Sequence, residues 1–215
     1  MNDYDHRQKL IFNYLKQSST IFLIGPMKMD AHHFQLQQEA NPGIPILIID
    51  GGSNHPNLSG FTIGDGDSTQ KTTGKLDITF EREKDFTDLE GLISLLPSSI
   101  KKIFAYGFMG GRLDHQLIVI HNFYQLSKKN FTEIYLVDEN PICIYPAGTT
   151  LLNYQGTFSL LNFDENKISI SGSIKYPVQN KSILPLSGKT LSNISFGEFE
   201  IQHTSPIGIY YLTKE

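Results

Sequence analysis

Residues 103–123 read IFAYGFMGGRLDHQLIVIHNF, which predicts a strand, a glycine-rich turn and a helix in direct succession. The apolar run before the turn is typical of a buried strand, and the residues after it continue as a helix. Gly110 and Gly111 let the backbone approach a ligand closely, and the helix N-terminus behind them favours an anion. Arg112 suits a phosphate, and Asp114 suits a cation or a hydroxyl group. The turn therefore predicts a ligand site at the end of a strand.

The same alternation of strands and helices extends over the first two thirds of the chain. Continuous apolar strands separated by helices predict a mainly parallel sheet that is covered on both faces. Ligands of such sheets bind at the carboxyl ends of the strands. The expected strands are 20–25, 44–49, 61–63, 78–80, 102–106 and 132–137, and the expected helices are 6–17, 30–39, 87–96 and 114–128.

The helical signal disappears after Pro141. Short strand-like runs divided by Gly, Pro, Asn and Asp predict an antiparallel sandwich or barrel. These runs are 149–154, 156–162, 167–174, 191–202 and 207–213. We therefore expect an α/β N-terminal domain at residues 1–142 and an all-β domain at residues 143–215.

Composition narrows the class of protein. Hydrophobic residues make up 39% and charged residues 19% of the 215 residues, as in soluble globular proteins. The net charge of −4 gives no support for nucleic-acid binding. Cys143 is the single cysteine, so an intramolecular disulfide is excluded and a zinc site is not expected. Because neither a secretory signal nor an apolar run of about 20 residues is visible, we expect a cytoplasmic protein without a membrane partner.

Two further turns place carboxylates at strand ends. Asp50 follows an apolar run and precedes two glycines, and Asp65 and Asp67 flank Gly66 after the next strand. Each turn by itself is also explained as a tight turn or a solvated loop. Two like charges so close together are unfavourable unless donors, water or a cation compensate them. A hard divalent ion such as Mg²⁺ suits them, because it takes carboxylates together with phosphate oxygens and water.

A fourth acidic motif opens the helix expected at 87–96. Thr87 and Glu90 form a capping box, which explains both residues structurally. Asp85 and Asp88 are less easily explained, although acidic residues also suit the first turn of a helix. Since acidic residues recur at strand-to-helix junctions along one expected sheet edge, the pattern favours a metal-nucleotide site.

The ordered motifs resemble those of the thiamine pyrophosphokinase family, and the resemblance covers roughly residues 45 to 215. The segment Ile174-Lys175-Tyr176-Pro177 and the late pair Ser192-Asn193 extend it into the β-rich region. The earlier motifs that carry it are DGGSN at 50–54, GDGDS at 64–68, KDFTD at 84–88 and GGRLDH at 110–115.

The resemblance implies a catalytic α/β domain followed by a β-sandwich, assembled as a homodimer. It also implies transfer of a pyrophosphoryl group from Mg-ATP to the hydroxyl of thiamine, with release of AMP. On the matching positions, Mg²⁺ is expected at Asp65, Asp67 and Asp88, with Asp50 and Asp85 supporting that metal cluster.

The resemblance further implies roles for the remaining motif residues. Arg112 is expected to hold phosphate oxygens, and Asp114 and His115 to lie beside the reacting groups. The catalytic set is then Asp67, Asp88, Arg112 and Asp114. Tyr176, Ser192 and Asn193 are expected in the thiamine pocket, across the dimer interface. The remaining substrate- and nucleotide-binding positions are Asp50, Gly51, Ser53, Asn54, Lys84, Thr87, Gly110 and Gly111.

Two positions depart from the family's pattern. Gly66 stands where the family has a bulky apolar residue, which makes the loop more flexible. Val119 stands where a small polar residue is expected, so one hydrogen-bonding group on the site helix is lost. Two alternatives stay open: a non-catalytic sensor of nucleotide or thiamine diphosphate, and another Mg-dependent phosphotransferase or nucleotide hydrolase.

Overall fold

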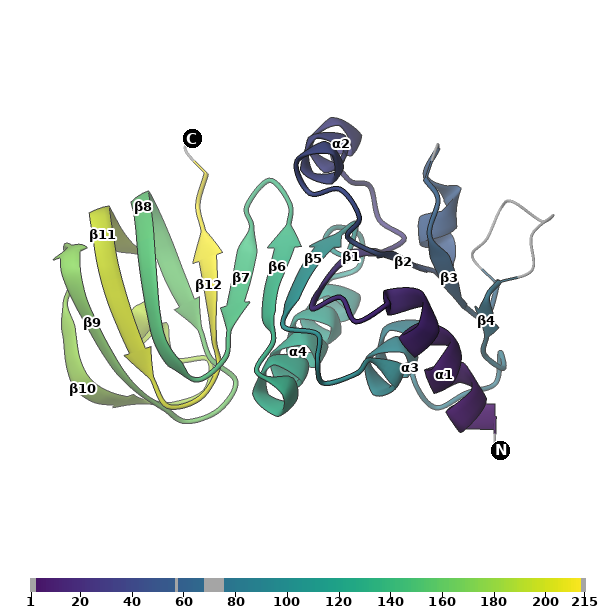
Figure 1. Ribbon diagram of the computed structural model, residues 1–215. Coiled ribbons are helices and arrows are strands. Elements are labelled where there is room, and N and C mark those ends of the chain that lie inside the picture. Colours follow the sequence, from purple (N-terminus) through teal and green to yellow (C-terminus); the bar gives the residue numbers. More distant parts are fainter. Residues whose placement is uncertain (1–2, 57, 68–75, 214–215) are drawn as a thin grey trace. The chain divides into compact units, whose positions relative to one another are not determined.

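The computed structural model describes residues 3–56, 58–67 and 76–213 (Figure 1). The chain divides into two compact units, Met1–Asn122 and Phe123–Glu215. No helix in the described part of the chain is long and apolar enough to cross a membrane.

The first unit contains a parallel sheet in the order β5-β1-β2-β3-β4. Residues 21–24 of its strand β1 are buried, as the continuous apolar run predicted, and Phe22 is in register with Phe104 on one side and Ile46 on the other. The α/β class is thus confirmed. The strands are β1 (Thr20–Ile24), β2 (Ile46–Ile49), β3 (Phe61–Gly64), β4 (Ile78–Thr79) and β5 (Lys102–Tyr106).

The helices of this unit begin where the sequence provides caps. The Asp30 side chain accepts the backbone N–H of His33 at the start of α2, and Thr87 and Glu90 form the predicted capping box of α3. The connections β1–α2–β2 and β4–α3–β5 cross the sheet in opposite directions. Right-handed crossovers therefore put α2 and α3 on opposite faces, as Figure 1 shows. The helices are α1 (Asp3–Leu15), α2 (Ala31–Ala40), α3 (Asp88–Leu95), α4 (Leu113–Asn130) and the short 3₁₀ helix η1 (Asp50–Asn54).

The second unit is built on an antiparallel sheet in the order β10-β9-β11-β8-β12-β7-β6. Alternate side chains of its strands form the core, among them Phe158 and Phe199, whose rings stack 4.8 Å apart. The strands are β6 (Glu133–Val137), β7 (Ile142–Tyr145), β8 (Gly148–Leu161), β9 (Asn166–Ile174), β10 (Val178–Ile183), β11 (Asn193–His203) and β12 (Ile207–Tyr211), with the 3₁₀ helix η2 (Gly188–Thr190).

Several boundaries differ from the sequence expectations. The runs 149–154 and 156–162 form one strand, because Gly156 pairs with Ser195 and tolerates its φ of 143° inside β8. The compact units divide between Asn122 and Phe123, whereas the sequence pattern changes at residue 142. The reason is that β6 pairs with β7, and Lys128 of α4 contacts Asp164.

Candidate functional site

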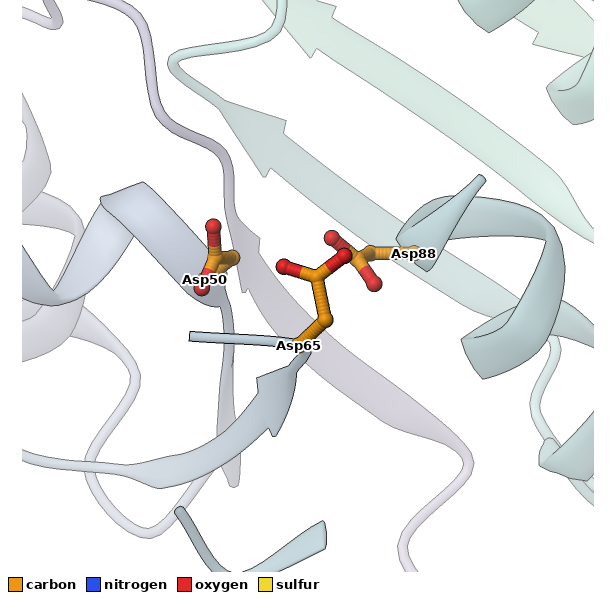
Figure 2. A group of neighbouring side chains, drawn as sticks. All are labelled: Asp50, Asp65 and Asp88. Carbon is orange, nitrogen blue, oxygen red and sulfur yellow. The ribbon is translucent and has the colours of Figure 1, made fainter. Parts of the chain in front are cut away.

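Three carboxylates from separate elements meet at the carboxyl end of the parallel sheet. Asp50 follows β2, Asp65 follows β3, and Asp88 begins α3. One oxygen of each lies within 4.8 Å of the others. Figure 2 shows the three side chains directed toward one another. The structure therefore brings together acidic residues from three of the four predicted turns.

Asp50 is held in an unusual conformation. Its φ is 34°, and only 4% of the residue is exposed. The backbone N–H of Gly66 donates to Asp50 Oδ1 at 3.0 Å. A Cβ atom at Gly64 would lie 2.7 Å from Asp50 Cβ, so glycine at 64 makes room for this side chain. Strained backbone at a buried carboxylate is typical of a functional site.

Lys84 lies among these carboxylates. Its Nζ is 2.5 Å from Asp65 Oδ2 and 3.1 Å from Asp88 Oδ1. Burial lowers the pKa of Lys84, but the hydrogen bonds to Asp65 and Asp88 outweigh burial and raise it. Burial raises the pKa of Asp65, yet the hydrogen bonds from Lys84 and Asp67 together with the charge of Lys84 outweigh burial, and the pKa falls. At Asp88 burial prevails over Lys84, and the pKa is raised.

The donor set fits a hard divalent cation. Three carboxylates and one ammonium group leave the cluster with net negative charge. Asp88 Oδ1 is buried and lies 3.1 Å from Lys84 Nζ, which it shares with Asp65. Carboxylates that share a single ammonium group repel one another unless a further cation compensates their charge. Asp50, Asp65 and Asp88 would hold such an ion through oxygen ligands, as Mg²⁺ prefers.

Two other predicted metal residues lie outside this group. Asp67 is exposed, and its backbone N–H donates to Asp65 Oδ1 at 3.1 Å. Asp85 is exposed on the loop before α3. Their roles as ligands stay predictions. Ser68, the last residue of the quoted motif, lies outside the described residues.

A cavity of about 520 Å³ adjoins the acidic cluster. Its walls combine polar groups with an apolar part that the sequence motifs did not indicate. The apolar lining is Pro26, Met27, Ile49, Leu89, Phe108, Ile118 and Val119. The lining predicted from sequence is Asp50, Gly51, Lys84, Thr87, Asp88, Gly110, Gly111, Arg112 and His115.

The turn before α4 closes one side of this cavity. Gly111 adopts a φ of 70°, and a Cβ there would lie 3.1 Å from Met27 Sδ. Arg112 lines the cavity, but in this structure its guanidinium also pairs with Asp114, with Nε 3.1 Å from Oδ1 and Nη2 2.5 Å from Oδ2. This pairing lowers the pKa of the exposed Asp114 carboxyl. Asp114 itself is not part of the lining.

Ser53 has a structural partner within its own turn. Its Oγ donates to the carbonyl oxygen of Asp50 at 2.9 Å, which stabilises the η1 turn. Neither Ser53 nor Asn54 lines the cavity. Binding roles for these two residues stay predictions.

In the second unit, the structure brings Tyr176 and Asn193 together. Asn193 Nδ2 donates to the Tyr176 carbonyl at 2.8 Å, and the Tyr176 N–H donates to Asn193 Oδ1 at 3.1 Å. The Tyr176 residue is 53% exposed, so its ring does not pack in the core. Ser192 has a φ of 56° and donates its N–H to Ser159 Oγ. The amide of Asn193 therefore fixes the backbone that carries an exposed aromatic ring.

A parallel α/β sheet with carboxylates, a lysine and an arginine around one cavity is typical of proteins that bind phosphorylated ligands with a divalent cation. Residues 37–136 match the family model described as thiamin pyrophosphokinase, catalytic domain. This part of the chain therefore matches the catalytic domain of the thiamine pyrophosphokinase family, which confirms the resemblance drawn from the motifs.

Solved structures support the same fold over both units. The thiamine pyrophosphokinase of Bacillus subtilis is 22% identical, with a TM-score of 0.71 over 91% of this chain and 100% of that one. The thiamin pyrophosphokinase of Candida albicans is 16% identical, with a TM-score of 0.72 over 93% of this chain and 90% of that one. No curated protein matched the sequence. At these identities the likeness to solved structures concerns the fold.

Proposed function

We propose that this protein is a thiamine pyrophosphokinase, which converts thiamine and Mg-ATP to thiamine diphosphate and AMP. The observation that carries the proposal is the convergence of Asp50, Asp65, Asp88 and Lys84 beside a cavity that Arg112 also lines. The family match over residues 37–136 supports the same activity. The thiamine oxygen would attack the β-phosphorus, the bond from that phosphorus to the α-phosphate oxygen would break, and the hydroxyl proton would leave.

The acidic cluster would position and neutralise the polyphosphate. Bound Mg²⁺ would supply Lewis-acid stabilisation of phosphate oxygens. Asp50 is buried and strained, so its oxygen is already in position before a ligand arrives. Asp67 and Asp85 would support the cluster from the exposed side. Catalysis would depend on positioning and charge more than on covalent chemistry.

Arg112 and Asp114 would act as a pair beside the reacting groups. The bidentate contact holds the guanidinium plane at the edge of the cavity, where it would bind phosphate oxygens. We assign to Asp114 the orientation of the thiamine hydroxyl. Its lowered pKa favours orientation over proton removal, because a weaker base takes up a proton less readily.

The thiamine site would use the β-rich unit. An exposed tyrosine on a backbone fixed by Asn193 is suited to a flat, cationic ligand. We propose that Tyr176, Ser192 and Asn193 contact thiamine in a cytoplasmic homodimer, with the β-rich unit as a sandwich domain at the dimer interface.

The test is to incubate the protein with Mg-ATP and thiamine and to identify the products by mass. We expect thiamine diphosphate and AMP in equal amounts. ADP with thiamine monophosphate would contradict pyrophosphoryl transfer. Release of phosphate to water without thiamine would instead support a nucleotide hydrolase, and ligand binding without turnover would support a sensor.

A further inference from the structure

One face of α4 lines the cavity along two helical turns. His115, Ile118, Val119 and Asn122 all belong to the lining, and their spacing of three and four residues places them on one side of the helix. Asn122 lies roughly 10 Å along the helix from His115, at a rise of 1.5 Å per residue. The polar side chain at 122 is therefore well separated from the phosphate-binding turn.

Among the described residues of this face, Asn122 has a side-chain nitrogen without a hydrogen-bond partner. Its Nδ2 is buried, and it makes no hydrogen bond. An amide in this condition costs free energy in the empty protein and recovers it when a ligand supplies the partner. Val119, one turn earlier, has no hydrogen-bonding side chain. Asn122 thus offers, one turn later, the kind of polar group that position 119 lacks.

We infer that Asn122 is a specificity-determining residue that binds the amino-bearing edge of the nucleotide base. This inference rests on the proposed function, because it takes the ligand of the cavity to be Mg-ATP. A carboxamide presents a donor beside an acceptor, which matches the amino group and neighbouring ring nitrogen of adenine. Ile118 and Val119 provide apolar contact for a flat base next to the amide.

The experiment measures equilibrium binding in Mg²⁺ without thiamine, so that no turnover is needed. The probes are ATP and purine riboside triphosphate, which lacks the 6-amino group. We expect the wild-type protein to bind ATP about fivefold to tenfold more tightly, the range of a single hydrogen bond. Equal affinity for the two probes would overturn the inference without any variant being made.

Asn122→Leu provides the second arm, because it keeps the approximate volume and removes both polar atoms. ATP binding should weaken by about fivefold to tenfold more than binding of the analogue, because the analogue keeps the ring nitrogen and lacks only the amino group. The inference would be overturned if the affinities for ATP and the analogue fell equally, or if both were unchanged. Asn122→Ser keeps a donor and an acceptor and serves as the test if the leucine variant is unfolded. The serine variant must then discriminate less between ATP and the analogue than the wild type does.

Thiamine carries a similar aminopyrimidine edge, so its affinity is measured in parallel. A loss of thiamine binding alone in Asn122→Leu would overturn the assignment to the nucleotide. The inference and the proposed function fail separately. Discrimination of ATP without formation of thiamine diphosphate would contradict the proposed function but not the inference. Formation of thiamine diphosphate that does not depend on Asn122 would contradict the inference but not the function.

Discussion

The cavity of the first unit and the antiparallel sheet of the second differ in how their buried polar groups are paired. In the first, Asp50 is buried on a strained backbone, and Asn122 Nδ2 is buried without a hydrogen bond. In the second, the buried amides of Asn162 and Asn166 are bonded to the backbone on several sides. This difference teaches that satisfied polar groups stabilise the fold, while an unsatisfied one in a cavity lining indicates a site for a ligand.

The largest effect expected on this comparison comes from Asp88→Asn. Losing one charge from the cluster removes several kcal/mol of transition-state stabilisation, so turnover should fall by about 10²–10³-fold. The fold should survive, and thermal unfolding should show it. The matched control is Asp164→Asn, which breaks the Lys128 ion pair in the second unit and should leave turnover unchanged. Near-normal turnover of a folded Asp88→Asn variant would contradict the role of the cluster.

Asp67→Asn sharpens the same test within the first unit. The family motif implies a ligand at Asp67, whereas the observed cluster contains Asp50, Asp65 and Asp88. If Asp67 also holds the metal, turnover should fall by orders of magnitude, since charge at the metal matters most in the transition state. Steady-state rates over a range of Mg²⁺ concentrations measure this loss. Wild-type rates in the Asp67→Asn variant would contradict a role of Asp67 as a metal ligand.

Asn166→Ala is the corresponding test of the second unit. Asn166 Oδ1 accepts the N–H groups of Thr204 and Ser205, and Nδ2 donates to the carbonyls of Ser205 and Pro206. Removing the amide leaves these groups unpaired, so the free energy of unfolding in urea should fall by about 3 kcal/mol. Turnover per folded molecule should not change. The exposed Asn153→Ala is the control, and an equally large effect there would refute the explanation.

Tyr176→Ala tests the point where the comparison should break down, because Tyr176 belongs to the second unit yet is proposed to bind a substrate. Loss of a contact worth about 0.5–2 kcal/mol should raise the KM for thiamine by roughly twofold to thirtyfold. The KM for ATP should stay close to wild type. Tyr176→Phe keeps the ring and should behave as wild type, and Phe196→Ala removes another exposed aromatic ring. Unchanged KM values in Tyr176→Ala would exclude the assignment.

The smallest effect concerns pH and His203. Burial lowers the pKa of His203 below its ordinary value of 6.5, despite the opposing hydrogen bond to the carbonyl of Ser205. The unfolded chain therefore takes up a proton below pH 6.5 before the folded protein does. The free energy of unfolding should decrease as the pH falls from 6.5 toward the folded pKa, by at most about 1.4 kcal/mol per pH unit.

Urea unfolding of the wild type and of His203→Gln over this pH range measures the effect. The variant should have a flatter pH profile than the wild type. His6→Gln, on the exposed face of α1, serves as the control and should keep the wild-type slope. An identical slope in His203→Gln would show that other groups produce the pH dependence.

Local signals in the sequence predicted much of the fold. The apolar runs of β1 and β2 and the capping box at Thr87 and Glu90 depend on neighbouring residues, and the structure contains all of them. β10 was missed because its residues are polar and mostly exposed, which leaves no alternating apolar pattern. β10 belongs to the sheet because it pairs with β9, and the local sequence pattern does not reveal this pairing.

The sequence predicted which turns contribute residues to the site, but it did not predict most contacts between those residues. Acidic residues after strands identified Asp50, Asp65 and Asp88, because parallel strands end at one sheet edge. The apolar wall around Phe108 and the position of Lys84 between two carboxylates depend on tertiary packing. A helical-face analysis of the residues after His115 was the available signal for Asn122.

The close approach of Gly64 to Asp50 carries a consequence for the history of this chain. A side chain at 64 has to displace the carboxylate, so a substitution at the end of β3 also affects the functional residue that follows β2. Substitutions at the two positions are therefore coupled, and a change at one is tolerated only with a compatible residue at the other. Grafting this acidic site onto another α/β scaffold would require both residues to be carried across together.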